Sequence, residues 1–370
     1  MRNGLNISSL SEFVHEIRST PEEAMLRYHA HASLVHPDLV AIETQTAWAG
    51  TIRVARPFTF QAQLPGTLDR RNSITPLEYA QAALLGCVLV TYVYGASSKG
   101  IVLSSLSASS EADVCQRGDG QVLSNVRYSL AVDADTDDQT VTGIGRYVSF
   151  LSPNHRTWVE KNELLVAVCV KGRGVARAEV VLTPESFEAG APSLSPAHDS
   201  VGCRLAWRYG TQLDGQVVRR LSSALPLPIC VDQPKQYMGI DLAANPQELL
   251  LAALGSDVLG QLSALARAEQ LPLGSARIEL GGSLDLRGVM NVERSAPVKL
   301  VSPSATLHIE SDADANRLQE LGLQAFRLSA VCRLLCTPHE VGVAISTRGK
   351  EALRFKSNER LLRAQLAAAE

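Results

Sequence analysis

The sequence has few aromatic residues, no marked excess of charge of either sign and no long uninterrupted hydrophobic run. Aromatic residues make up 5% of the 370 residues, and 35 Lys and Arg stand against 38 Asp and Glu, for a net charge of −3. This balance removes the main reason to expect a nucleic-acid partner. No stretch has the roughly 20 apolar residues of a membrane span, and the N-terminus lacks the features of a signal peptide. A cytoplasmic protein is therefore expected.

The seven cysteines also lack the paired spacings of a disulfide framework or a zinc site. They are scattered and odd in number, so a reduced protein with free thiols is expected. His29 and His31 lie two apart in a strand-like run, where an exposed histidine pair is commoner than a metal site. Neither a metal nor any other cofactor is expected.

The chain contains an internal repeat. Residues 75–87 and 245–257 each begin with a polar residue and a proline and continue as a run of mostly small residues and leucine. Proline suits the first position of a helix, because its missing N–H has no partner there. Both helices are apolar on nearly every face, and a helix of this kind is buried. Each half of the chain is therefore predicted to contain one buried central helix.

Alternating segments, which are typical of half-buried strands, surround both helices. A second helix is expected to open at Asp133–Asp135 in the first half and at Asp312–Asp314 in the second, since aspartate favours a helix N-terminus. An amphipathic helix at 10–26 precedes the first half, and a helix at 358–369 closes the second. The expected strands are 40–48, 52–63, 101–108, 126–132, 204–208, 216–221, 276–280 and 305–309. Strands in hairpin-like runs indicate the α+β class.

Length and composition divide the chain into two domains. At roughly 100–200 residues per domain, a chain of this length suggests two. Residues 184–200 are rich in Pro, Ser, Ala and Gly, which is typical of a linker. The expected domains are residues 1–190, with the N-terminal helical extension, and residues 200–370, with the C-terminal helix.

Several short motifs, in this order and spacing, resemble those of the OsmC/Ohr family of osmotically inducible and organic hydroperoxide resistance proteins. The helix that opens at Pro76 and reaches Gly86-Cys87 is similar to the family's signature, and the second repeat follows it. Asp232-Gln233-Pro234, Leu284 to Gly288, and Ser152-Pro153 are similar to further elements of the family. The resemblance implies two tandem OsmC/Ohr-like domains that form an intramolecular pseudo-dimer around the buried central helices.

Fusion allows the two interface sites of such a dimer to differ, whereas a homodimer keeps them identical. Family members that reduce peroxides use a reactive cysteine, which the resemblance places at Cys87, and a resolving cysteine on the second helix. The second half has Asp257 at the reactive position, and Ser152 and Ser329 stand at the two resolving positions. Neither half therefore has the pair of cysteines.

Two other family residues are displaced or missing. Leu77 and Gln247 follow the helix-opening prolines where the family has a glutamate, and Glu78 and Glu248 come one residue later. Glu78 lies about 180° from Cys87 around the helix, so no role beside the thiol is expected for it. No arginine is assigned to the family's helper position.

A reactive Cys87 needs a nearby base or cation, because only the thiolate is nucleophilic and the helix dipole fades within one turn. His155 lies three residues after Ser152, and the family geometry brings this segment toward the thiol. A Cys87–His155 pair, with Arg156 adding positive charge, would supply a nucleophile and a general base. Alternatively, His155 and Arg156 cap the end of a helix.

Asp257 interrupts an apolar stretch, and a buried carboxylate is costly unless it is paired or protonated. Either an arginine such as Arg333 or Arg267 pairs with it, or its pKa is raised and it acts as an acid. Ser329 and Cys332 are expected to line the same site.

In the first half, Thr91 and Tyr94 share a helix face with Cys87. Together with Ser152 they would line a pocket for a small, mostly apolar ligand, or they complete the helix core.

Three functions fit these residues. The first is a cysteine-dependent enzyme with one site, Cys87 assisted by His155, which by resemblance reduces organic hydroperoxides and is regenerated by an external thiol. The second uses the same pair for acyl transfer, hydrolysis or modification of a metabolite. The third is a non-catalytic binding protein for a small apolar ligand. All three have a small-molecule partner and no nucleic acid or membrane, in a monomeric pseudo-dimer or a homodimer.

Overall fold

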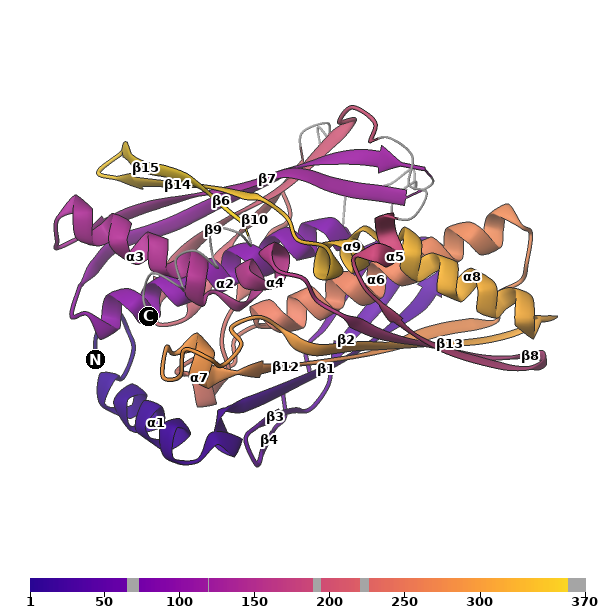
Figure 1. Cartoon of the computed structure of the whole chain (residues 1–370), viewed down its shortest axis with the longest axis horizontal. Helices are drawn as coiled ribbons and strands as arrows, with labels where there is room; N and C mark the ends of the chain where they lie inside the picture. Colours follow the sequence, from indigo (N-terminus) through magenta and orange to yellow (C-terminus); the bar gives the residue numbers. More distant parts are fainter. Residues whose placement is uncertain (65–72, 119, 189–193, 220–225, 359–370) are drawn as a thin grey trace.

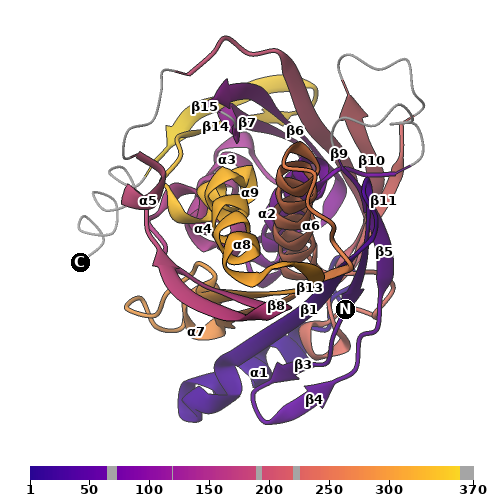
Figure 2. The same ribbon diagram turned by 90° about the vertical axis from the view of Figure 1, so that its right-hand side faces the viewer.

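The computed structural model describes residues 1–64, 73–118, 120–188, 194–219 and 226–358. Two sheets enclose a set of helices, and the two longest helices run side by side through the centre (Figures 1 and 2). The helices are α1 (Ile7–Ser19), η1 (Pro21–Ala24), α2 (Pro76–Ser98), α3 (Asp138–Leu151), α4 (Pro153–Val159), α5 (Glu185–Glu188), η2 (Lys235–Tyr237), α6 (Pro246–Ala268), α7 (Leu286–Val289), α8 (Ala315–Leu328) and α9 (Ala330–Cys336). The predicted α+β class is confirmed.

The described residues form one eight-stranded and one seven-stranded sheet. The eight-stranded sheet contains β1 (Met25–His36), β2 (Leu39–Thr44), β3 (Ala47–Ala49), β4 (Ile52–Val54), β5 (Thr59–Gln63), β8 (Leu164–Leu182), β12 (Ser275–Asp285) and β13 (Val301–Asp314). The seven-stranded sheet contains β6 (Leu103–Arg117), β7 (Gly120–Ala134), β9 (Asp199–Tyr209), β10 (Gln212–Arg219), β11 (Pro228–Val231), β14 (Val341–Thr347) and β15 (Lys350–Ser357).

Each sheet combines strands from both halves of the chain. In the eight-stranded sheet, the hairpin β12–β13 of the second half lies between β1 and β8 of the first, antiparallel to β1 and parallel to β8. In the seven-stranded sheet, the hairpin β6–β7 of the first half lies in the same way between β9 and β14 of the second. This matching order suggests a duplication. The domain boundary between residues 190 and 200 remains a prediction. In the structure, both sheets contain strands from both halves of the chain.

The starts of α2 and α6 are built alike. Proline occupies the first helical position of each, and Thr75 and Asn245 are the N-caps. The Thr75 N–H donates to Glu78 at 2.7 Å, and the Asn245 N–H donates to Glu248 at the same distance, which completes a capping box in each helix. These reciprocal bonds fix the first turn of both helices, which is where α6 meets the other half.

The two central helices are buried core helices. By length and composition either would cross a membrane, but 83% and 78% of their apolar windows are buried inside the fold. They pack against each other at Gly86, where an added Cβ would lie 3.3 Å from Pro246 and 3.1 Å from Val231. The prediction of two buried central helices is confirmed.

Several boundaries differ from those expected. The second helix of the first half, α3, begins at Asp138 with Asp137 as its N-cap, because β7 continues through Asp133 to Ala134. Its counterpart α8 has Asp314 as N-cap, as predicted. Strands β8, β11, β14 and β15 were not predicted. The helix expected at 10–26 ends earlier, because α1 stops at Ser19 and β1 begins at Met25. The helix expected at 358–369 lies outside the described residues apart from Asn358.

Candidate functional site

Cys87 lies in the middle of α2, facing the start of α4 and the start of α6. It is 4% exposed, so its thiol is enclosed by the fold. Because α2 and α4 belong to the first half of the chain and α6 to the second, the site is formed by both halves.

Two donors contact the Cys87 sulfur, the Asn154 N–H and the Gln247 side-chain amide. The buried Ser152 hydroxyl also acts on the thiol but has no hydrogen-bond partner among the described residues, and we call these three groups the Cys87 cradle. The Asn154 N–H, at the first turn of α4, donates to Sγ at 3.4 Å, and Nε2 of Gln247 donates to Sγ at 3.5 Å. The Asn154 side chain holds the cradle together. Its Nδ2 donates to the carbonyl oxygen of Pro246 at 3.1 Å, and its Oδ1 lies 3.3 Å from Nε2 of Gln247.

Burial and the cradle act on the thiol in opposite directions. Burial raises the pKa of Cys87, while Asn154, Ser152 and Gln247 lower it, and the balance remains above the ordinary value. The resting thiol is therefore neutral near pH 7. The cradle groups favour the thiolate, because donors stabilise a negatively charged sulfur.

His155 is fully buried, and both of its ring nitrogens have partners other than Cys87. Nδ1 lies 3.3 Å from the Tyr128 hydroxyl, and Nε2 lies 2.8 Å from the Ser357 hydroxyl. Burial, with a smaller contribution from Arg156, lowers the pKa of His155 to about 3, so the ring is neutral. Burial raises the pKa of the Tyr128 hydroxyl, and a negative charge on Cys87 raises it further. The partner of His155 is therefore sensitive to the charge on Cys87.

Arg156 makes local contacts. It forms an ion pair with Glu160, one turn later in the same segment, and Nη1 donates to the carbonyl oxygen of Phe150 at 3.1 Å. Phe150 lies in the last turn of α3, so Arg156 satisfies the end of that helix, which agrees with the capping interpretation.

Thr91 and Tyr94 also form hydrogen bonds within the fold. The Thr91 hydroxyl donates to the carbonyl oxygen of Cys87 at 2.8 Å, and the Tyr94 hydroxyl donates to the carbonyl oxygen of Tyr237. A ligand pocket lined by these two side chains remains a prediction.

The second half repeats the geometry with a carboxylate in place of the thiol. Oδ2 of Asp257 accepts from the Ser329 hydroxyl at 2.6 Å and from the Val331 N–H at 3.0 Å. Val331 stands two residues after Ser329, as Asn154 stands two residues after Ser152. Cys87 and Asp257 therefore each receive the N–H of the residue two places after a serine.

Burial raises the pKa of Asp257, and its hydrogen bonds, first that of Ser329, lower it. Of the two arginines considered as partners, Arg333 donates to the carbonyl oxygen of Phe187 at 3.0 Å and Arg267 pairs with Asp38 at 2.9 Å. A hydroxyl and backbone N–H groups thus satisfy the carboxylate.

Cys332 lies in this second site but makes no disulfide. Its N–H donates to the Ser329 hydroxyl at 3.1 Å, and its side chain is fully buried. Burial, with a smaller contribution from Cys336, raises its pKa well above the ordinary value. All seven cysteines are free, and Cys332 and Cys336 are core residues.

Arg56, between β4 and β5, anchors the first turn of α6. Its Nε and Nη2 donate to the two carboxylate oxygens of Glu248 at 3.1 and 3.2 Å. It also pairs with Asp241 and donates to the carbonyl oxygen of Ala243 at 2.8 Å. Because Glu248 directly follows Gln247, this buried ion pair fixes the backbone of the residue that reaches the thiol.

No group of three or more His, Cys, Asp or Glu side chains placed to hold a metal occurs among the described residues. His29 and His31 lie on β1 with their side chains on one face of the strand, and burial lowers the pKa of His29.

Four residues of the site were not predicted: Gln247, Asn154, Tyr128 and Arg56. Gln247 had a weak signal, since it occupies the family's glutamate position after Pro246, but its contact with the thiol of the other half depends on how the two helices pack. The remaining three carry no motif and are recognised only by what they touch.

Comparison with known proteins finds a family match over part of the chain. Residues 69–162, about a quarter of the chain, match the family of OsmC-like proteins, and this segment contains Cys87 and the start of α4. No curated protein matches the chain. A crystal structure of an OsmC-like protein from Mycoplasma pneumoniae shares 18% sequence identity over 32% of this chain and 84% of that chain, with a TM-score of 0.25.

Proposed function

We propose that the protein is a cysteine-dependent enzyme with a single divergent site at Cys87, which reduces a small, partly apolar organic hydroperoxide at the expense of an external thiol. The main support is the Cys87 cradle, in which two groups from different halves donate to one sulfur. Donors aimed at a sulfur atom stabilise the thiolate, which is the nucleophilic form. The OsmC-like match over this segment supports the same chemistry.

In the proposed reaction, the Cys87 sulfur attacks one oxygen of the hydroperoxide and the O–O bond breaks. The alcohol leaves with the proton from the thiol, and Cys87 becomes a sulfenic acid. One external thiol then forms a mixed disulfide with release of water. A second external thiol attacks that disulfide and regenerates Cys87. The external thiol is needed because Ser152 stands at the family's resolving position.

The proposed base, His155, has no direct contact with the thiol among the described residues. Its ring nitrogens are occupied by Tyr128 and Ser357, so it would assist Cys87 only indirectly. The low pKa of His155 makes it a weak proton acceptor. The cradle therefore provides the larger part of the activation.

Cumene hydroperoxide in the presence of dimedone is expected to add one dimedone per chain, measured by intact mass. The adduct should disappear in Cys87→Ser, because only this thiol has the cradle, and persist in Cys115→Ser, whose cysteine is also buried. An adduct that survives in Cys87→Ser, or no adduct in the native protein, would contradict the proposal.

The rate of Cys87 alkylation, measured beside the dimedone assay, separates the alternative functions. Rapid alkylation of Cys87 at neutral pH without peroxide turnover favours acyl transfer or hydrolysis. If Cys87 is alkylated no faster than an unfolded thiol, the hypothesis that remains is a non-catalytic binding protein. A His155→Gln variant is expected to form the adduct more slowly, and an unchanged rate removes His155 as the base.

Replacing Gln247 with leucine is expected to raise the pKa of Cys87 by about 1 unit and to slow its alkylation at pH 7 by about 10-fold, since one donor to the thiolate is lost. Iodoacetamide labelling of Cys87 as a function of pH, followed by peptide mass spectrometry, measures both quantities. Gln139→Leu, an exposed position on α3, is the matched control. A Gln247→Leu profile that coincides with the native profile would show that the amide has no effect on the thiol.

A further inference from the structure

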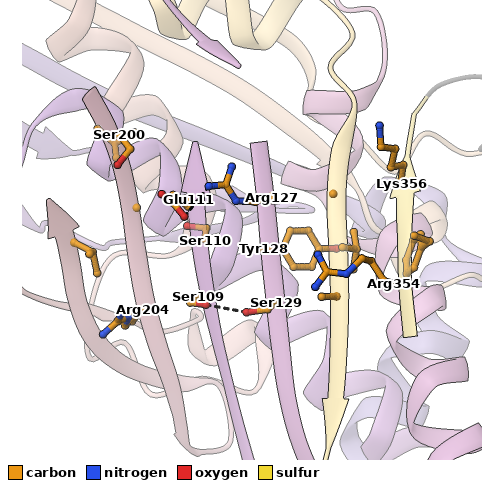
Figure 3. A pocket seen from close by; sticks show the side chains of 17 residues that line it. Ser109, Ser110, Glu111, Arg127, Tyr128, Ser129, Ser200, Arg204, Arg354 and Lys356 are labelled. Carbon is orange, nitrogen blue, oxygen red and sulfur yellow. Dashed lines mark hydrogen bonds and ion pairs between the residues drawn. The ribbon is translucent and has the colours of Figure 1, made fainter. Parts of the chain in front are cut away.

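A groove of about 970 Å³ lies on the seven-stranded sheet (Figure 3), on the face that points away from the central helices. It crosses β15, β14, β7, β6 and β9. Among the described residues, the helices cover only the inner face of this sheet (Figure 2), so the groove lies on the opposite side of the sheet from Cys87. Of its lining residues, Tyr128 also belongs to the Cys87 site, through its contact with His155.

The strand register places one row of side chains straight across the groove. Arg354 pairs with Ala344, Ala344 with Ser129, Ser129 with Ser109, and Ser109 with Arg204. The two arginines thus stand at the ends of the row, with three small residues between them. Four strand spacings separate their backbones, which is about 19 Å.

A second row lies beside the first and adds charge. It runs from Lys356 through Gly342, Arg127 and Glu111 to Gly202. The lining of the groove therefore contains four cationic side chains and one carboxylate, in a chain whose net charge is −3. The small residues form the floor and the cations stand around them (Figure 3).

The cations of the groove are either unpaired or held in exposed ion pairs. Arg204 has no ion pair or side-chain hydrogen bond among the described residues. Arg127 pairs with Glu111 of the same groove at 2.8 Å, and both side chains are 44–46% exposed. Arg354 pairs with Glu351 at 2.5 Å and Lys356 with Glu340 at 2.6 Å, but these side chains are 45–71% exposed. Exposed pairs contribute about 0–1 kcal/mol, so an anion in the groove can replace them.

The floor of the groove also offers a hydroxyl donor. Oγ of Ser109 and Oγ of Ser129 are 2.8 Å apart, and only one of them donates in that bond. The hydroxyl that accepts keeps its own proton for another acceptor. Arginine guanidinium and serine hydroxyl groups together are typical ligands of phosphate.

We propose that this groove binds the polyphosphate group of a small molecule. The row is wider than a single phosphate, so the cations at its two ends act together only on an extended anion. The groove is also of small-molecule size. Its two aromatic residues face inward: the Tyr128 hydroxyl meets His155, and the Phe355 ring lies 5.9 Å from the Arg146 guanidinium of α3. Without rings to stack on bases, a nucleic-acid strand fits less well.

Inorganic tripolyphosphate is the probe that tests this, by isothermal titration calorimetry of the full chain at low ionic strength. Binding is expected to be tighter than that of orthophosphate. Arg204→Gln and Arg354→Gln should each weaken it by about 10-fold, since each removes charged hydrogen bonds. The matched control is Arg277→Gln, an arginine on the eight-stranded sheet that pairs with Glu279, and it should bind like the native protein.

Three results would overturn the proposal: no heat with tripolyphosphate, equal affinities for Arg204→Gln and the native chain, or an equal loss in Arg277→Gln. Binding of an acidic peptide or of single-stranded DNA, but not of tripolyphosphate, would also overturn it and assign the groove to that ligand. Thermal unfolding of each variant shows whether it is folded. Cys87→Ser should bind tripolyphosphate normally, which keeps this test independent of the proposed reaction.

Discussion

Replacing Arg56 with methionine is expected to lower the free energy of unfolding by about 3–5 kcal/mol, which is the cost of leaving one member of a buried ion pair alone. The side chain of Arg56 is fully buried and that of Glu248 is 1% exposed. Without the guanidinium, the carboxylate keeps only the Asn245 N–H as donor in the part of the chain that the structure describes, at 2.7 Å. The variant also loses the donor to the carbonyl oxygen of Ala243.

The loss should depend on pH. Burial raises the pKa of Glu248 and Arg56 opposes it, so removing Arg56 raises that pKa further. An acid with a higher pKa in the folded state stabilises the fold while protonated, and this stabilisation is lost as the pH rises through the folded pKa. The deficit of Arg56→Met is therefore smaller near about pH 5 than near about pH 8.

Urea unfolding followed by circular dichroism measures the deficit, provided that the transition is two-state. The double variant Arg56→Met/Glu248→Gln is expected to recover much of the loss, because it no longer buries an unpaired charge. Arg277→Met, which breaks an exposed pair, should change stability by about 0.5 kcal/mol or less. A similar small effect for Arg56→Met would mean that the ion pair does not hold α6 in place.

Replacing Asp257 with leucine is expected to cost about 2–4 kcal/mol, because two buried donors lose their acceptor. The Ser329 hydroxyl and the Val331 N–H both donate to this carboxylate, in a site with no exposed surface on Ser329 or Val331. Asp257→Asn keeps an acceptor oxygen and should cost much less near pH 7. The comparison of the two variants separates loss of the acceptor from loss of the charge.

Asp257→Asn should also remove a pH dependence. The pKa of Asp257 is raised in the folded state, so its contribution is greatest when it is protonated and declines as the pH rises through the folded pKa. Urea unfolding between about pH 4 and pH 8 is expected to show this decline in the native chain and less of it in Asp257→Asn. Asp312→Asn, at an exposed position, is the control and should follow the native curve. Identical slopes for all three proteins would rule out a raised pKa at Asp257.

The elements that the sequence predicts well are those with a strong local signal. The two central helices have an opening proline, a capping pair and an apolar run, and they form where these signals place them. Asp314 caps α8 as predicted. In contrast, Asp133 and Asp135 carry the same helix signal, but Asp133 lies in β7, which pairing with β6 extends to Ala134, and Asp135 follows the strand. At Asp133, pairing with a strand from another part of the chain outweighs the local preference for a helix N-terminus.

The site was harder to predict than the helices. Position in the repeat predicts that Cys87 corresponds to Asp257 and Ser152 to Ser329, and in the structure each of Cys87 and Asp257 receives an N–H from the residue two places after that serine. It did not reveal Gln247, which meets the thiol through the packing of α6 on α2. Sequence spacing also favoured a contact of His155 with Cys87, whereas the first turn of α4 presents the N–H of Asn154 to the sulfur and the His155 ring to Tyr128. A shift of one residue on a short helix decides which group reaches the thiol.

The sharing of strands between the halves determines when the chain can fold. The first half contributes β8 to a sheet whose neighbouring strand, β13, begins at Val301, and β7 pairs with β14, which begins at Val341. Neither sheet can be completed until most of the chain has been synthesised. Contacts between residues this far apart in the sequence slow folding, because the entropy of closing a long loop is lost before the stabilising contacts form. During synthesis, the emerging first half exposes the apolar surface of α2 and unpaired strand edges, so the unfinished chain is more prone to aggregation than the complete fold.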